Sequence, residues 1–94
     1  LIKAKALIEK GWTQQDYVRD ANGDSAGVCD TNACSWCIVG ALSKASFDTG
    51  KMITGPFDVL SAQIGGQDVA RWNDKPGRTK KEVLDLFDKA IAAA

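Results

Sequence analysis

The residues from Asp30 to Phe47 constrain the fold of this chain more than any other stretch. Apolar and small side chains recur there at intervals of three and four positions, which places them on one face of an α-helix. This face is preceded by Asp30, Thr31 and Asn32, each of which is a good N-cap residue. We therefore predict a central helix here, and its buried face comprises Cys34, Cys37, Ile38, Ala41, Leu42 and Ala45.

A first helix and a hairpin are expected before the central helix. Residues 1–10 have helical periodicity, and Gly11 is expected to end this helix with a positive φ. A short strand is predicted at 17–19, followed by an Asn-Gly pair at 22–23, which is a strong hairpin signal. The returning strand is then expected at 26–29.

Two further helices are expected after the central one. Residues 51–55 are predicted to be a link, and Pro56 suits the first turn of the next helix. Residues 67–72 add one helical turn. The last helix, over 79–93, begins with the Thr-x-x-Glu capping box at 79–82. Its predicted apolar stripe comprises Val83, Leu84, Phe87, Ala90 and Ile91.

These elements predict one compact domain over residues 1–94, because the chain has 94 residues and no linker of biased composition. The fold class is α+β and mainly α, with about four helices and a small β-hairpin between the first and second. The two long outer helices are expected to pack on the central helix. Gly40 on that helix is expected to let another backbone approach closely.

Composition excludes several classes of function. Histidine is absent, so catalysis that needs a histidine base and zinc sites that need histidine are excluded. The 12 basic and 12 acidic residues give no net charge, which argues against a general nucleic-acid binder. We interpret a basic cluster at 75–81 as the solvated start of a helix. No apolar run is long enough to span a membrane.

The three cysteines suggest two kinds of site. The spacing C-x4-C-x2-C of Cys29, Cys34 and Cys37 is typical of plant-type iron–sulfur proteins, but no fourth cysteine exists. Zinc would also need a fourth ligand, and this could only be a water or one of the nearby residues Asp24 and Asp30. Cys34 and Cys37 form a CxxC motif near a predicted helix start, where the helix dipole favours the thiolate. Thiol–disulfide exchange is therefore an alternative function.

The preferred interpretation of the cysteines is structural. A thioredoxin-like domain places its CxxC motif after a buried parallel strand, and no such strand is predicted before Cys29. Cysteine is among the residue types most often buried. We therefore predict that Cys34 and Cys37 are core residues, and we predict no metal and no cofactor.

The segment Trp72-Asn73-Asp74 is the second candidate site. Its polar side chains could bind a small ligand, so Trp72, Asn73 and Asp74 are our ligand-binding candidates. The preferred interpretation is again structural: Trp72 anchors the loop, and Asn73 or Asp74 accepts hydrogen bonds from loop amides ahead of Pro76. The acids at 16, 20 and 24 lack the order of an EF-hand loop, so no calcium site is predicted.

Three motifs occur in a distinctive order along the chain. They are W-T-Q at 12–14, C-x-x-G-A-L at 37–42 and W-N-D at 72–74. In this order they resemble a family of small uncharacterised bacterial and phage proteins, a domain of unknown function. The resemblance implies one compact domain of bacterial or phage origin, and it implies no activity, cofactor or catalytic residue. Cys37 lies in the second motif, whereas Cys29 and Cys34 lie outside all three.

The sequence thus favours a non-enzymatic accessory or protein-interaction module. We expect it in the cytoplasm of a bacterium or a phage-infected cell, with a protein partner and with neither nucleic acid nor membrane as partner. The alternatives are a thiol–disulfide redox protein that uses Cys34 and Cys37, and a small-ligand-binding enzyme at the loop of Trp72 to Asp74.

Overall fold

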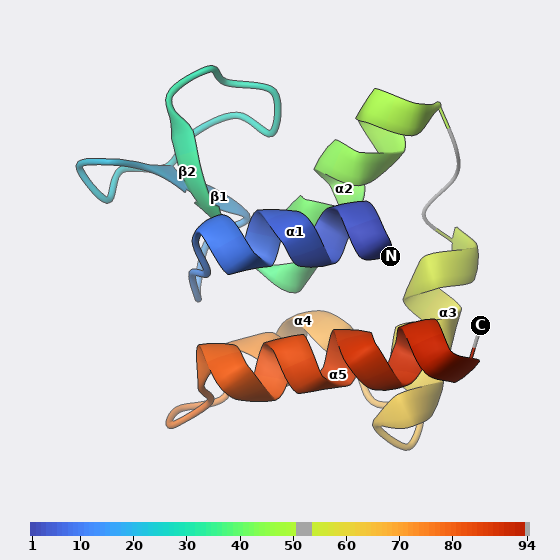
Figure 1. The fold of residues 1–94 in the computed structure, drawn as a ribbon. Coiled ribbons are helices and arrows are strands. Elements are labelled where there is room, and N and C mark those ends of the chain that lie inside the picture. The colour runs from blue at the N-terminus through green and yellow to red at the C-terminus, as the bar shows by residue number, and fades with distance from the viewer. Residues whose placement is uncertain (51–53, 94) are drawn as a thin grey trace.

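The computed structural model describes residues 1–50 and 54–93 (Figure 1). The predicted class is confirmed, because the domain is mainly helical with a two-stranded antiparallel sheet between the first two helices. The predicted turn at 67–72 forms a short helix of its own. The described elements are α1 (Ile2–Lys10), β1 (Val18–Asp20), β2 (Ala33–Trp36), α2 (Ile38–Thr49), α3 (Thr54–Gln63), α4 (Val69–Asp74) and α5 (Lys80–Ala93).

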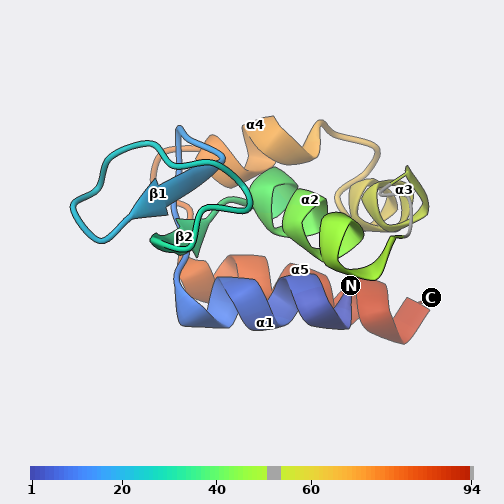
Figure 2. The ribbon, with the colours of Figure 1, turned by 90° about the horizontal axis from the view of Figure 1, so that it is seen from above.

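The helices form layers around α2. Figure 2 shows α2 between α4 on one side and the pair of α1 and α5 on the other. α1 and α5 run antiparallel and are linked by an ion pair between Lys5 Nζ and Asp88 Oδ1 at 2.7 Å. The outer helices were both expected to pack on α2, and this is right for α1. α5 packs instead mainly against α1 and α3.

The N-terminal part of the predicted central helix is wrong, because Ala33–Trp36 is the strand β2. β2 pairs with β1, with Val18 opposite Trp36, and the register shifts by one residue between Arg19 and Asp20. On the other side of β2, the Trp36 amide donates to Gly11 O and Trp36 O accepts from the Thr13 amide. Hydrogen bonding to two neighbours therefore holds this segment extended, although its side-chain spacing is helical.

The returning strand predicted at 26–29 is also wrong. The chain does reverse at the Asn-Gly pair, where Gly23 has a φ of +83°. The segment after this turn makes only an isolated bridge between Arg19 and Ser25 before the chain continues as a loop to β2. Burial explains why β1 pairs with β2 and not with residues 26–29, because Val18 and Trp36 are both buried where the two strands pair.

Two glycines allow backbones to approach each other closely. A Cβ atom at Gly40 would lie 2.0 Å from Tyr17 O, which confirms the predicted close approach and identifies the neighbour as the segment before β1. A Cβ atom at Gly11 would lie 2.1 Å from Cys34 O. Gly11 was predicted to have a positive φ. It is extended instead, with φ −174°, a conformation that any residue can adopt. Glycine is required here because there is no room for a Cβ atom.

The helix ends follow the sequence signals where local chemistry decides them. At the start of α5 the Glu82 amide donates to Thr79 Oγ1 at 3.2 Å, and the Thr79 amide donates to Glu82 Oε1 at 3.0 Å, so the capping box is confirmed. α3 begins at Thr54, which places Pro56 in its first turn. Of the link predicted at 51–55, residues 51–53 lie outside the described residues, and Thr54 and Gly55 belong to α3.

The core lies between α1, α2 and α5 and extends to β1, β2, α3 and α4. Leu86 of α5 is buried although the predicted stripe lacks it. None of the described helices combines the length and the hydropathy needed to cross a bilayer. The buried apolar side chains are Ala4, Ile8, Val18, Trp36, Cys37, Ile38, Ala41, Leu42, Ala45, Leu60, Val69, Val83, Leu86, Phe87 and Ala90.

Candidate functional site

Asn73, near the end of α4, is buried, with 1% of its surface exposed. Its Oδ1 accepts hydrogen bonds from Trp12 Nε1 at 2.9 Å and from the Ile38 amide at 3.1 Å. Its Nδ2 donates to Thr13 O at 3.2 Å and to Asp74 Oδ1 at 3.0 Å. These four bonds use both donors and two acceptor positions of the amide group. Asn73 therefore joins the segment after α1 and the start of α2 to α4.

The segment that follows Trp12 is held against the same end of α4. Gln14 Nε2 donates to Asn73 O at 2.9 Å and to Lys75 O at 3.0 Å, and the Gln15 amide donates to Asp74 Oδ1 at 2.9 Å. Gln15 has a φ of +69°, a conformation that is uncommon for residues other than glycine. The predicted role is therefore right in part, because the Asp74 carboxylate accepts a hydrogen bond from a loop amide. The partners of Asn73 and Asp74 in the earlier part of the chain, however, lie 35 to 61 residues away rather than next to Pro76.

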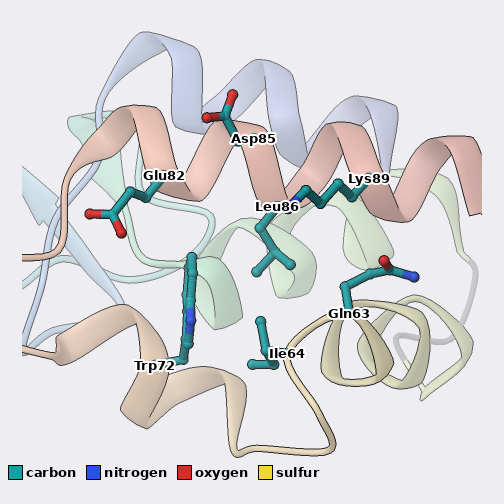
Figure 3. A pocket seen from close by; sticks show the side chains of 7 residues that line it. All are labelled: Gln63, Ile64, Trp72, Glu82, Asp85, Leu86 and Lys89. Carbon is teal, nitrogen blue, oxygen red and sulfur yellow. The ribbon is translucent and has the colours of Figure 1, made fainter.

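The side chain of Trp72 has a different environment. The Arg78 guanidinium lies 3.8 Å from the centroid of its ring, and Arg78 Nε donates to Trp72 O at 2.9 Å. Trp72 forms one end of a surface pocket of about 200 Å³ between the end of α3, α4 and α5 (Figure 3). In Figure 3, Ile64 and Leu86 point toward each other between Trp72 and Gln63. We call this cavity the Trp72 pocket, and its lining residues are Gln63, Ile64, Trp72, Glu82, Asp85, Leu86 and Lys89.

A second hollow, of about 330 Å³, lies on the Asn73 side of α4. Asp74 and Cys37, which the sequence placed in two separate candidate sites, both line it. Its other lining residues are Gln15, Asp16, Tyr17 and Ala70. The structure therefore brings Asp74 to Cys37. Trp72 and Asp74 also line a larger open hollow of about 890 Å³ along α4 and the loop to α5. The contributions of Trp12, Gln14 and Gln15 were missed, since nothing in the local sequence links them to residues so far along the chain.

Comparison with known proteins places the chain in a family. A model of a family of unknown function, DUF6197, matches residues 1–93. The chain belongs to the DUF6197 family. No curated protein and no solved structure matches it. The expected membership of an uncharacterised domain family is thus confirmed, and it assigns no substrate, cofactor or partner to this DUF6197 domain.

The cysteines of this DUF6197 domain lie in different environments. Cys37 is buried as predicted and caps α2, because its Sγ accepts a hydrogen bond from the Gly40 amide at 3.3 Å. Cys34 was predicted to be buried but is exposed on β2, and Cys29 is also exposed. Among residues 1–50 and 54–93, no three Cys, Asp or Glu side chains are grouped as a metal site.

Burial is the largest influence on the Cys37 thiol and raises its pKa above the usual value, although hydrogen bonds from the Gly40 and Val39 amides act in the opposite direction. Thiol–disulfide exchange needs the reverse, since the attacking sulfur must be a thiolate. The Cys37 thiol of this DUF6197 domain is therefore a poor attacking group, and the exposed Cys34 is the accessible thiol of the CxxC motif.

The raised pKa predicts how the three thiols react. At pH 8 we expect two thiols to react rapidly with a thiol reagent and the Cys37 thiol to react slowly, whereas all three react rapidly in denaturant. Above about pH 8.5 the unfolded thiol ionises while the folded one stays protonated, so stability should fall as pH rises. A Cys29→Ser/Cys34→Ser variant isolates Cys37 for measurement. If the Cys37 thiol of that folded variant reacted with the reagent at pH 8 as fast as it does in denaturant, its buried position would be contradicted.

Proposed function

We propose that this domain is a non-enzymatic protein-interaction module, and that the Trp72 pocket receives a side chain of its protein partner. The observation that carries this proposal is the apolar floor of the pocket, where the buried Leu86 meets the half-buried Ile64 and Trp72. Its volume of about 200 Å³ is below the roughly 300–1,000 Å³ of typical small-molecule sites, and it suits one anchoring side chain.

The composition of the pocket supports this proposal. Protein interfaces combine an apolar centre with a polar rim, and tryptophan is enriched among the residues that contribute most to binding. Here a tryptophan and two aliphatic residues form the centre, and Gln63, Glu82, Asp85 and Lys89 form the rim. The polar groups of Asn73 are engaged inside the fold, so the W-N-D segment offers apolar contact at Trp72 more readily than reactive groups.

We also infer a cytoplasmic setting, in a bacterium or a phage-infected cell. All three cysteines are free thiols, which fits a reducing compartment. The bacterial or phage origin rests on the motif resemblance alone.

Selection of peptides tests the proposed function while the partner is still unidentified. The purified domain is panned against a random peptide library displayed on phage, and the selected peptides are titrated into isotope-labelled domain. We expect the NMR signals of the Trp72 indole and of the Ile64 and Leu86 amides to shift. Ile64→Glu should weaken binding by about 30-fold, as for loss of a hot-spot contact.

Ile2→Glu is the matched control, because Ile2 is 73% exposed on α1 and does not line the Trp72 pocket. It introduces the same side chain and should leave peptide affinity unchanged. Peptides that shift signals only around the hollow of Cys37 and Asp74, or a library that yields no binding peptide, would contradict the proposed function.

A further inference from the structure

The charges around the Trp72 pocket are ordered along α5. Glu82, Asp85, Leu86 and Lys89 follow one another at intervals of three, one and three residues, so they lie on one stripe of the helix. Figure 3 shows Glu82 at the Trp72 end of the pocket, whereas Lys89 leaves α5 toward the Gln63 end and its side chain runs back toward Leu86. Asp85 points away from Ile64 at the outer edge of the pocket. Along α5, two acidic residues, an apolar residue and a basic residue therefore follow one another beside the pocket.

Only part of this charge is balanced within the domain. Glu82 Oε2 accepts from Arg78 Nη1 at 2.8 Å, and this guanidinium holds the pKa of the Glu82 carboxyl below its usual range. Asp85 and Lys89, in contrast, make no ion pair or side-chain hydrogen bond with any described residue. An Asp and a Lys spaced four apart on a helix often pair with each other. Here the two remain separate on the rim, available to charges of a partner.

We propose that the occupant of the Trp72 pocket is a peptide segment of a partner protein in which one apolar side chain lies between a basic and an acidic residue. The apolar side chain occupies the floor of Ile64, Trp72 and Leu86. The basic residue lies toward Asp85 and the acidic residue toward Lys89. Charge complementarity of this kind sets the direction in which the segment binds and selects against wrong partners. This inference rests on the proposed function.

Exchange of the two rim charges tests the inference. A selected pocket-binding peptide is titrated against Asp85→Lys, Lys89→Glu and the variant with both changes. Each single change should weaken binding about fivefold at low salt, the upper range for an exposed ion pair. A peptide whose own basic and acidic residues are exchanged should bind the double variant within about twofold of the original pair, because both contacts are restored.

Matched charge changes elsewhere serve as controls. Lys3→Glu on α1 and Asp58→Lys on α3 alter exposed residues that do not line the pocket, so peptide affinity should not change. If peptides bind in the pocket and depend on Ile64, but their affinity is the same for all rim variants, the charge inference is overturned and the proposed function stands. If no peptide binds in the pocket, both are overturned.

Discussion

Gly40→Ala is expected to destabilise the domain by about 3 kcal/mol or more, at the upper end of overpacking costs. Alanine normally favours a helix over glycine, so the expected sign is the reverse of the usual one. The new Cβ would lie 2.0 Å from Tyr17 O, and the obstacle is backbone rather than a flexible side chain. Relief requires α2 to move from the segment before β1, which would break the 3.0 Å hydrogen bond from the Cys37 amide to Tyr17 O.

Urea unfolding followed by circular dichroism measures this effect, with Gly55→Ala as the matched control. Gly55 also lies in a helix, α3, but an added Cβ there meets no atom within 4 Å. Gly55→Ala should therefore be neutral or stabilise the domain by up to about 1 kcal/mol. Equal free energies of unfolding for the two variants would refute the close approach at Gly40.

Asn73→Leu is the second change with a large expected effect, a loss of about 3 kcal/mol. Leucine removes the acceptor of Trp12 Nε1 and of the Ile38 amide, and each donor left unpaired in a buried site costs about 1–3 kcal/mol. It also leaves Thr13 O without its donor from the amide group. For a domain of this size the melting temperature should fall by about 15 °C.

Thermal unfolding checks this second prediction, and Asn32→Leu is the control because Asn32 is exposed in the loop before β2. The indole proton signal of Trp12 should also move in Asn73→Leu, since its hydrogen bond is lost. A melting temperature within about 3 °C of the unmodified domain would mean that the bonds of Asn73 contribute little.

Sequence reasoning succeeded where the decisive interactions are local. The capping box of Thr79 and Glu82 lies within one turn of helix, and the Asn-Gly turn within four residues. It failed at Ala33–Trp36, where helical spacing continues through a segment that is a strand. The partners that decide this, Gly11, Thr13 and Val18, precede it by about 20 residues, and tertiary pairing overrides local periodicity.

The candidate site shows the same limit. Trp72, Asn73 and Asp74 were found from residue type and from the breakers that follow them, and their hydrogen-bonding role was partly foreseen. The sequence could not predict that Asn73 is a buried amide while Trp72 forms a pocket wall. This depends on which face of α4 meets the Trp12 segment and which meets α5. Likewise, the exposure of Cys34 follows from its position on β2, not from its spacing to Cys37.

The hydrogen bonds of Asn73 also bear on the order in which the domain assembles. They join residues 12 and 13 to residue 73, so a loop of about 60 residues must close before Trp12 and the start of α2 reach their final partners. Closing so long a loop is entropically costly, and contacts of this range slow folding. On the ribosome, the hydrogen bonds of Trp12, Thr13 and Ile38 to Asn73 can form only after α4 has emerged.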